Sequence, residues 1–235
     1  TYLDISLDSL VATSTIIGRK TFAGLPSFVS GTLDLGNLTI ERYCPDCPTV
    51  LYEGKTYHTV QIGNQCWLKE NLDVGTRIDG IHEQANNGII EKYCYDNDTA
   101  NCTTYGGLYQ WDEAMQYFRT PGSYGICPEG WHIPVLAEFQ TLLAVVNNNG
   151  NSLKEIGQGS GSGIGTNTSG FSALLVGQRR YDGVFEGLGY NTHFWSSTEF
   201  NFFNSYTLYM YNVGSSINLY EYGKVFGYCV RCIKY

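Results

Sequence analysis

Basic side chains are scarce in this chain. Lys and Arg total 14 among 235 residues, against 22 Asp and Glu, so the formal net charge is −8. Binding to the phosphates of nucleic acid needs a face rich in Lys and Arg, and no cluster of these residues occurs in the sequence. The shortage therefore excludes nucleic acid as an expected partner.

Long apolar runs are missing as well. The longest, such as Leu142 to Val146, fall far short of the roughly 20 residues that a bilayer-spanning helix needs. We therefore expect no membrane insertion.

Motifs of catalysis and metal binding are also absent. No two of the four histidines have the spacing of metal ligands, and there is no Gly-x-Ser-x-Gly nucleophile elbow. We therefore expect no catalytic residue, no metal site and no cofactor. Calcium stays open, because the "YDNDT" run at Tyr95–Thr99 offers carboxylate and carbonyl oxygens, although such a run is more often a solvated loop.

Turn-forming and β-forming residues, by contrast, are abundant. The 28 Gly and 19 Tyr favour many turns and strands over a helical bundle. A hairpin is expected from Thr49, with turns at Glu53-Gly54 and Gly63-Asn64. Several strands are expected from Phe171 onward, and the last should return beside the first.

Two helices are expected between these strands, separated from the hairpin by a polar loop at residues 93–107. The first, over residues 107–118, has on one face Leu108, Trp111, Met115 and Phe118. The second follows Pro134, and its apolar stripe is Leu136, Phe139, Leu142, Leu143 and Val146. This order of elements indicates an α+β fold with antiparallel strands.

Residues 1–43 differ from the rest of the chain. They are rich in Thr, Ser, Leu and Ile and contain no Cys, and the "CPDCP" run that follows interrupts any regular element. We expect a short β-rich N-terminal appendage or stalk-proximal segment at 1–43 and one main domain at 44–235.

The eight cysteines favour an oxidising, extracellular setting. Cys44-x-x-Cys47 and Cys229-x-x-Cys232 could instead form a four-thiolate zinc site. The second pair lies in an apparent strand, "YCVRCIKY", where residues three apart face opposite sides, so disulfides are the better interpretation. The short spacing of Cys94 and Cys102 predicts a local loop closure.

A segment near the C-terminus has an unusual composition. Tyr, Asn, Ser and Phe make up most of residues 200–223, and the only charge there is Glu221. In "SYTLYMYN", alternation places Leu208 and Met210 on one face and Tyr209 and Tyr211 on the other. Such rings also fill strands for packing alone. With Leu and Met facing the core, however, the Tyr face is exposed, which indicates a ligand.

Six phrases in the same order over residues 49–235 resemble a known family. They are "GNQCWLKENLDVG", "YGGLYQWDEA", "CPEGWHIPVLAEFQTLL", "SGFSALLVGQR", "FWSSTE" and "GYCVRCIKY". Together they resemble the Fibrobacter succinogenes major paralogous domain, which has a C-type-lectin-like fold related to the formylglycine-generating group. The set is also similar to the variable proteins of diversity-generating retroelements, in which a reverse transcriptase rewrites adenines so that Asn codons become a wide set of residues.

The resemblance implies a function and a site. The chain would be a receptor-binding or adhesion protein whose hypervariable region, residues 190–228, displays one exposed surface. Its partner would be a macromolecular ligand, a cell-surface protein, bound by a monomer outside the cytoplasm, on a cell surface or a virion. Tyr, Asn and Ser suit such a surface because Tyr gives rigid contact area and Asn and Ser give adaptable hydrogen bonds. The expected ligand-binding residues are Tyr190, Asn191, His193, Phe200, Asn201, Phe202, Asn204, Tyr206, Tyr209, Tyr211, Asn212, Ser215, Ser216, Asn218, Tyr220 and Tyr222.

The resemblance also implies disulfides beyond the local one. The lectin-like pattern indicates Cys127–Cys232. The family usually has neither Cys66 nor Cys229, so their joint presence indicates that they pair, which leaves Cys44 with Cys47.

Two other functions stay open. One is a formylglycine-generating-type oxidase, which uses a reactive cysteine pair in the C-terminal region, here Cys229 and Cys232. The other is a structural surface or assembly protein whose Tyr face is a permanent oligomer interface.

Overall fold

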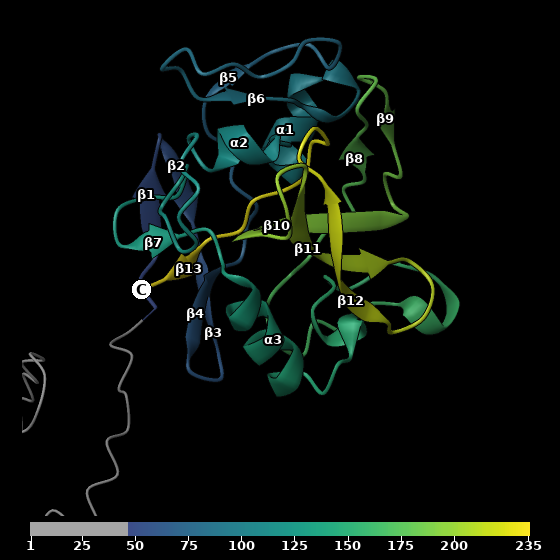
Figure 1. Ribbon diagram of the computed structural model, residues 1–235. Coiled ribbons are helices and arrows are strands. Elements are labelled where there is room, and N and C mark those ends of the chain that lie inside the picture. The colour runs from purple at the N-terminus through teal and green to yellow at the C-terminus, as the bar shows by residue number, and fades with distance from the viewer. Residues whose placement is uncertain (1–46) are drawn as a thin grey trace, which may run out of the picture. The chain divides into compact units, whose positions relative to one another are not determined.

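The computed structural model describes residues 47–235 (Figure 1). The appendage expected at residues 1–43, like Cys44, lies outside the described residues. The described part contains a few helices and several small sheets, most of them antiparallel, which makes it an α+β fold as predicted.

Two hairpins begin the described part. Strands β1 (Val50–Tyr52) and β2 (Lys55–Tyr57) form the first, and β3 (Thr59–Ile62) and β4 (Gln65–Leu68) form the second. At the first turn Glu53 and Gly54 have φ of 49° and 76°, the left-handed values of a two-residue hairpin turn. Both turns lie where they were predicted.

The last strand returns beside the second hairpin. Strand β13 (Ile233–Lys234) pairs with β4 on one side and with β7 (Trp131–His132) on the other, which gives the sheet order β3-β4-β13-β7. This confirms the predicted return of the chain.

The helices agree with the sequence only in part. Helix α3 (Leu136–Val145) lies where the second helix was predicted, and its Phe139 and Leu142 are buried. The first predicted helix is a single turn, α2 (Trp111–Ala114). It ends early because Gln116 and Tyr117 have φ of 49° and 62°, outside the helical region, and Phe118 is exposed instead of packed.

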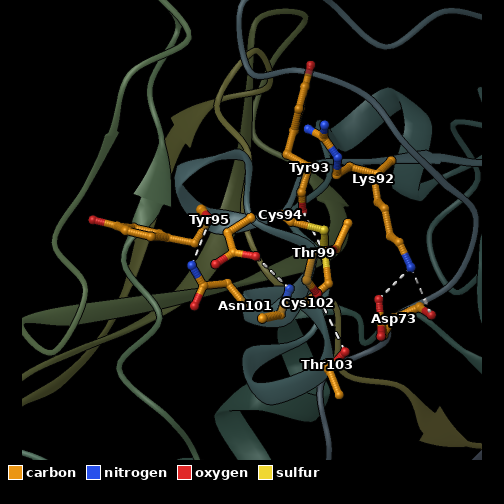
Figure 2. The surroundings of a disulfide bond; sticks show 12 residues. Asp73, Lys92, Tyr93, Cys94, Tyr95, Thr99, Asn101, Cys102 and Thr103 are labelled. Carbon is orange, nitrogen blue, oxygen red and sulfur yellow. Dashed lines mark hydrogen bonds and ion pairs between the residues drawn. A yellow bond between two sulfur atoms is a disulfide. The ribbon is translucent and has the colours of Figure 1, made fainter.

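Helix α1 (Thr99–Tyr105) lies within the segment predicted as a polar loop. The Asp98 side chain caps it by accepting a hydrogen bond from the Ala100 N–H at 2.9 Å. The Cys94–Cys102 disulfide ties it to the residue that precedes the 3-10 turn at Tyr95–Asn97 (Figure 2). Two side-chain oxygens of the calcium candidate thus bond to the backbone, since Asn97 Oδ1 also accepts from the Gly80 N–H. No cluster of His, Cys, Asp or Glu suited to a metal ion occurs within residues 47–235.

The remaining short elements surround the two larger sheets. A parallel pair consists of β5 (Thr76–Arg77) and β6 (Glu91–Lys92), and an antiparallel pair of β8 (Gln178–Arg179) and β9 (Phe185–Glu186). Single 3-10 turns lie at Tyr95–Asn97, Gly150–Ser152 and Gly161–Gly163.

The antiparallel sheet with the longest strands is built from the C-terminal third of the chain. It contains β10 (Asn191–Glu199), β11 (Asn204–Tyr211) and β12 (Ile217–Gly223) in that order. Helix α3 lies against its inner face, as Figure 1 shows. There Phe194, Leu208 and Met210 are fully buried.

Two hydrophobic clusters form the core. The first gathers aromatic rings from distant segments, with Trp67 5.6 Å from both Phe139 and Phe171, and Phe171 5.7 Å from Phe194. The second contains the cysteines Cys66, Cys127 and Cys232 together with three Trp side chains.

The disulfides correct part of the predicted scheme. Cys94–Cys102 and Cys127–Cys232 are confirmed, but Cys66 pairs with Cys47. The predictions of Cys66–Cys229 and Cys44–Cys47 are therefore wrong. Cys66 and Cys229 cannot pair because they are buried in different hydrophobic clusters, Cys66 in the second and Cys229 in the first. Cys229 is left as a buried free thiol.

The same separation bears on the zinc alternative. Cys229 and Cys232 lie in different clusters, so the two side chains point away from each other. Three disulfides in one domain indicate an extracellular or secreted protein. Within residues 47–235, every helix is too short or too polar to span a bilayer.

Candidate functional site

The outer side of the β10–β11–β12 sheet carries the residues that the alternation predicted to be exposed. The strand register places Tyr209 between His193 and Asn218, and Tyr211 opposite Asn191. Tyr220 and Tyr222 project from the same side of β12, opposite Thr207 and Ser205. We call the aromatic face the six residues Asn191, Tyr209, Tyr211, Asn218, Tyr220 and Tyr222.

The four Tyr rings of the aromatic face form a connected group. Tyr209 is at its centre, with ring centroids 6.2 Å from Tyr220 and 6.5 Å from both Tyr211 and Tyr222. Tyr211 is 40% exposed and Tyr220 47%, while Tyr209 and Tyr222 are half-buried. Burial raises the pKa of Tyr209 and of Tyr222, so the hydroxyls stay protonated and the face is uncharged at neutral pH.

His193 is not an exposed contact residue, and that prediction is wrong. Its side chain lies beneath the Tyr rings, with centroid distances of 4.6 Å to Tyr209 and Tyr222 and 4.2 Å to Tyr228. It is 2% exposed, and burial lowers its pKa to about 3. The neutral imidazole therefore acts as a packed support for the rings above it.

The inner side of the same strands confirms the predicted alternation. Leu208 and Met210 are fully buried, and Ile217 of the neighbouring strand is nearly so. Because successive side chains point to opposite faces, the exposed Tyr211 and Tyr220 can change in sequence without opening a cavity beside Leu208 and Met210. Tyr222 differs, because it also packs against the second hydrophobic cluster.

The other predicted residues lie at the two ends of the sheet rather than on the aromatic face. Strand β11 is eight residues long, which corresponds to about 23 Å. One end holds Phe200, Asn201, Phe202, Asn204 and Tyr206, and the opposite end holds Tyr190, Asn212, Ser215 and Ser216. Most are exposed, but the structure does not bring these two groups together.

Tyr206 shows how the first group differs from the aromatic face. By alternation it shares the parity of Leu208 and Met210, and its ring packs edge-on against Phe200 at 5.6 Å. Beside it, the Arg119 guanidinium lies 5.1 Å from the Phe202 ring centroid and pairs with Glu199 at 2.8 Å. This end of the sheet is therefore aromatic but bordered by charge.

Three aromatic residues near the site were left out of the expected ligand-binding set. Phe203 is the most exposed ring of the β10–β11 turn at 74%, and its position beside Phe202 in the same turn was an available signal. Tyr181 and Phe226 pack edge-on at 6.0 Å next to Tyr228. Tyr181 lies outside the segment of unusual composition, so no local pattern indicated it.

The fold and the site define a disulfide-linked α+β domain with an uncharged, Tyr-rich sheet face. The chain belongs to the Fibrobacter succinogenes major domain family, whose family model matches residues 60–234. This match covers the second hairpin, the three helices and the whole β10–β11–β12 sheet. No curated protein matches the chain, and no solved structure does.

Proposed function

We propose that this protein binds a macromolecular ligand, a protein on a cell surface, through the aromatic face, and so acts in receptor binding or adhesion. One observation carries the proposal: Tyr209 and Tyr211 project outward from the same strand whose Leu208 and Met210 fill the core. A regular sheet holds the Tyr rings in place, so little conformational entropy is lost when a partner binds.

We further propose a C-type-lectin-like scaffold that is diversified by a retroelement over residues 190–228. Two features support this. The residues in question lie on one sheet and its two turns, and their outward positions are separated from the core by strand alternation. Display on a cell surface or a virion is part of the same proposal and agrees with the three disulfides.

The gene tests this proposal. A near-identical repeat should lie nearby, together with a reverse transcriptase gene, and the two copies should differ only at adenines of the repeat. The differences should fall in codons of outward residues such as Tyr209, Tyr211 and Tyr220, while the codons of Leu208 and Met210 stay identical. If no repeat exists, or if differences fall equally on both sets, diversification is refuted and the ligand-binding proposal stands alone.

The bonding and burial of the C-terminal cysteines argue against the oxidase alternative. Cys232 is bonded to Cys127, and Cys229 is completely buried. Burial raises the pKa of the Cys229 thiol to about 12, whereas a reactive cysteine needs an accessible thiolate. This pair therefore lacks the properties that such chemistry requires.

A further inference from the structure

A concave site lies apart from the aromatic face. It is a cavity of about 360 Å³ whose lining includes Lys55, Lys69, Glu70, Tyr105, Glu155 and Arg231. Thr103 of α1, labelled in Figure 2, also lines it. None of the aromatic-face residues takes part. Its volume is at the small end of the range for small-molecule sites.

Arg231 is an incompletely paired cation in the wall of this cavity. It is 1% exposed and lies between the rings of Phe171 and Phe194, at 4.4 and 5.0 Å from their centroids. Its guanidinium donates to the Phe171 carbonyl and, at 2.6 Å, to Asn71 Oδ1. Its Nε has no hydrogen-bond partner, and no carboxylate within residues 47–235 forms an ion pair with it.

The Arg231 guanidinium stays charged although it is buried. Burial lowers its pKa to about 10, so the guanidinium is still protonated at neutral pH. The carboxylates of Glu70 and Glu155 act on this charge from a distance, because neither forms an ion pair with it. An anionic group that reached the guanidinium would add the direct partner that stabilises a buried charge.

The other charged residues of the lining indicate which charges the ligand carries. The Lys69 side chain forms no ion pair with any residue of 47–235, so a second cation is available beside Arg231. Glu70 and Glu155 supply negative charge in the same lining. Each already has a neighbour, since Glu70 contacts His58 at 2.8 Å and Glu155 accepts a hydrogen bond from the Asn167 amide at 3.0 Å. Cations and carboxylates in one small cavity match a ligand that carries both signs.

We propose that this cavity binds a small zwitterion of amino-acid size, with its carboxylate directed to Arg231 and Lys69 and its ammonium directed to Glu70 and Glu155. The site takes a ligand of a different class from that of the aromatic face, so each can be tested without the other.

Titration calorimetry with three probes tests the proposal. L-glutamine carries both charges, propionate carries only the carboxylate, and propylammonium carries only the ammonium. L-glutamine should bind with a Kd of about 1 mM or tighter, propionate more weakly and propylammonium most weakly. Absence of L-glutamine binding at about 10 mM overturns the proposal, because 360 Å³ is ample for it. Equal binding of L-glutamine and propionate also overturns it, since the carboxylates of Glu70 and Glu155 then contribute nothing to the affinity.

Substitutions test whether L-glutamine binds in this cavity. Arg231→Met risks unfolding, because the side chain is part of the core. Lys69→Gln removes a half-buried cation of the lining and should weaken L-glutamine binding about tenfold, as expected for loss of a charged hydrogen bond. Lys234→Gln is the matched control, because this half-buried lysine on β13 lies outside the cavity. Equal effects of the two changes, or none from Lys69→Gln, refute the site.

Discussion

At the scale of single residues, neighbours in strand β11 have opposite environments. Met210 is fully buried in the first hydrophobic cluster, while Tyr211 is 40% exposed on the aromatic face. Removing a buried apolar side chain lowers the free energy of unfolding, because both its hydrophobic burial and its packing contacts are lost. Removing an exposed ring lowers that free energy less. Sequence adjacency therefore does not imply similar energetic roles here.

This contrast predicts two different unfolding free energies. Met210→Ala should lower the free energy of unfolding by about 2–5 kcal/mol. Tyr211→Ala should lower it by less than about 1 kcal/mol, because the ring is partly solvated and its loss leaves no cavity. Urea unfolding at neutral pH measures both, with Tyr220→Ala as a second exposed example. A Tyr211→Ala loss as large as that of Met210→Ala would mean that the Tyr rings are core.

His193 predicts a pH dependence of stability. Its pKa is lowered to about 3 by burial, against about 6.5 in an unfolded chain. Between these two values the unfolded state binds more protons than the folded state, so stability falls as the pH drops below 6.5. Well above pH 6.5 the residue is neutral in both states and its ionisation has no effect.

The measurement compares the wild type with His193→Phe. The loss attributable to His193 should approach about 1 kcal/mol for each pH unit between roughly 6 and 4. Phe keeps a ring against Tyr228 but cannot be protonated, so its stability should fall less steeply over the same range. Parallel pH profiles for the two proteins would show that His193 is charged or solvated in the fold.

At the scale of elements, the turns and helices with strong local sequence patterns are those that were predicted correctly. The hairpin turns were predictable because Glu53-Gly54 and Gly63-Asn64 allow left-handed backbone. Helix α3 was predictable from its apolar stripe. Helix α1 was not, because its Thr, Asn and Cys residues are weak helix formers. It depends instead on the Asp98 cap and on the Cys94–Cys102 disulfide.

The disulfides should differ in what they contribute. Cys127–Cys232 joins residues 105 apart, whereas Cys94–Cys102 joins residues 8 apart. Closing a longer loop restricts the unfolded chain more, so replacing the first pair by Ala should cost about 5 kcal/mol and the second about 2–3 kcal/mol. Urea midpoints of the two double variants measure the order. The reverse order would contradict the prediction, because it would show that the Cys94–Cys102 disulfide contributes more to stability than the Cys127–Cys232 disulfide.

At the scale of the whole molecule, the site combines segments that local patterns cannot relate. Alternation within β11 was enough to place Leu208 and Met210 inside. It did not reveal that His193 is covered, because Tyr228, from the end of the chain, stacks on it at 4.2 Å. Nor did it reveal that Cys66 and Cys229 lie in different clusters, which only the tertiary structure decides.

The assembly state follows from the proposed use of the aromatic face. A face reserved for another protein should remain free, so the chain should be a monomer of 26.2 kDa in dilute solution. Analytical ultracentrifugation over a range of concentrations measures this. A dimer that dissociates on Tyr211→Ser with Tyr220→Ser, but not on Lys234→Gln, would instead identify the aromatic face as an oligomer interface.

The Cys47–Cys66 bridge has a mechanical consequence. A pull on the chain ahead of Cys47 passes through the covalent bond directly to Cys66 in β4. The β1–β2 hairpin and strand β3 lie inside the bridged loop and are therefore relieved of tension. The force arrives instead in the four-stranded sheet, where β4 pairs with β13 next to the bond between Cys127 and Cys232. A force applied to the chain before Cys47 thus loads the Cys47–Cys66 bond and the four-stranded sheet before it can separate β1, β2 or β3.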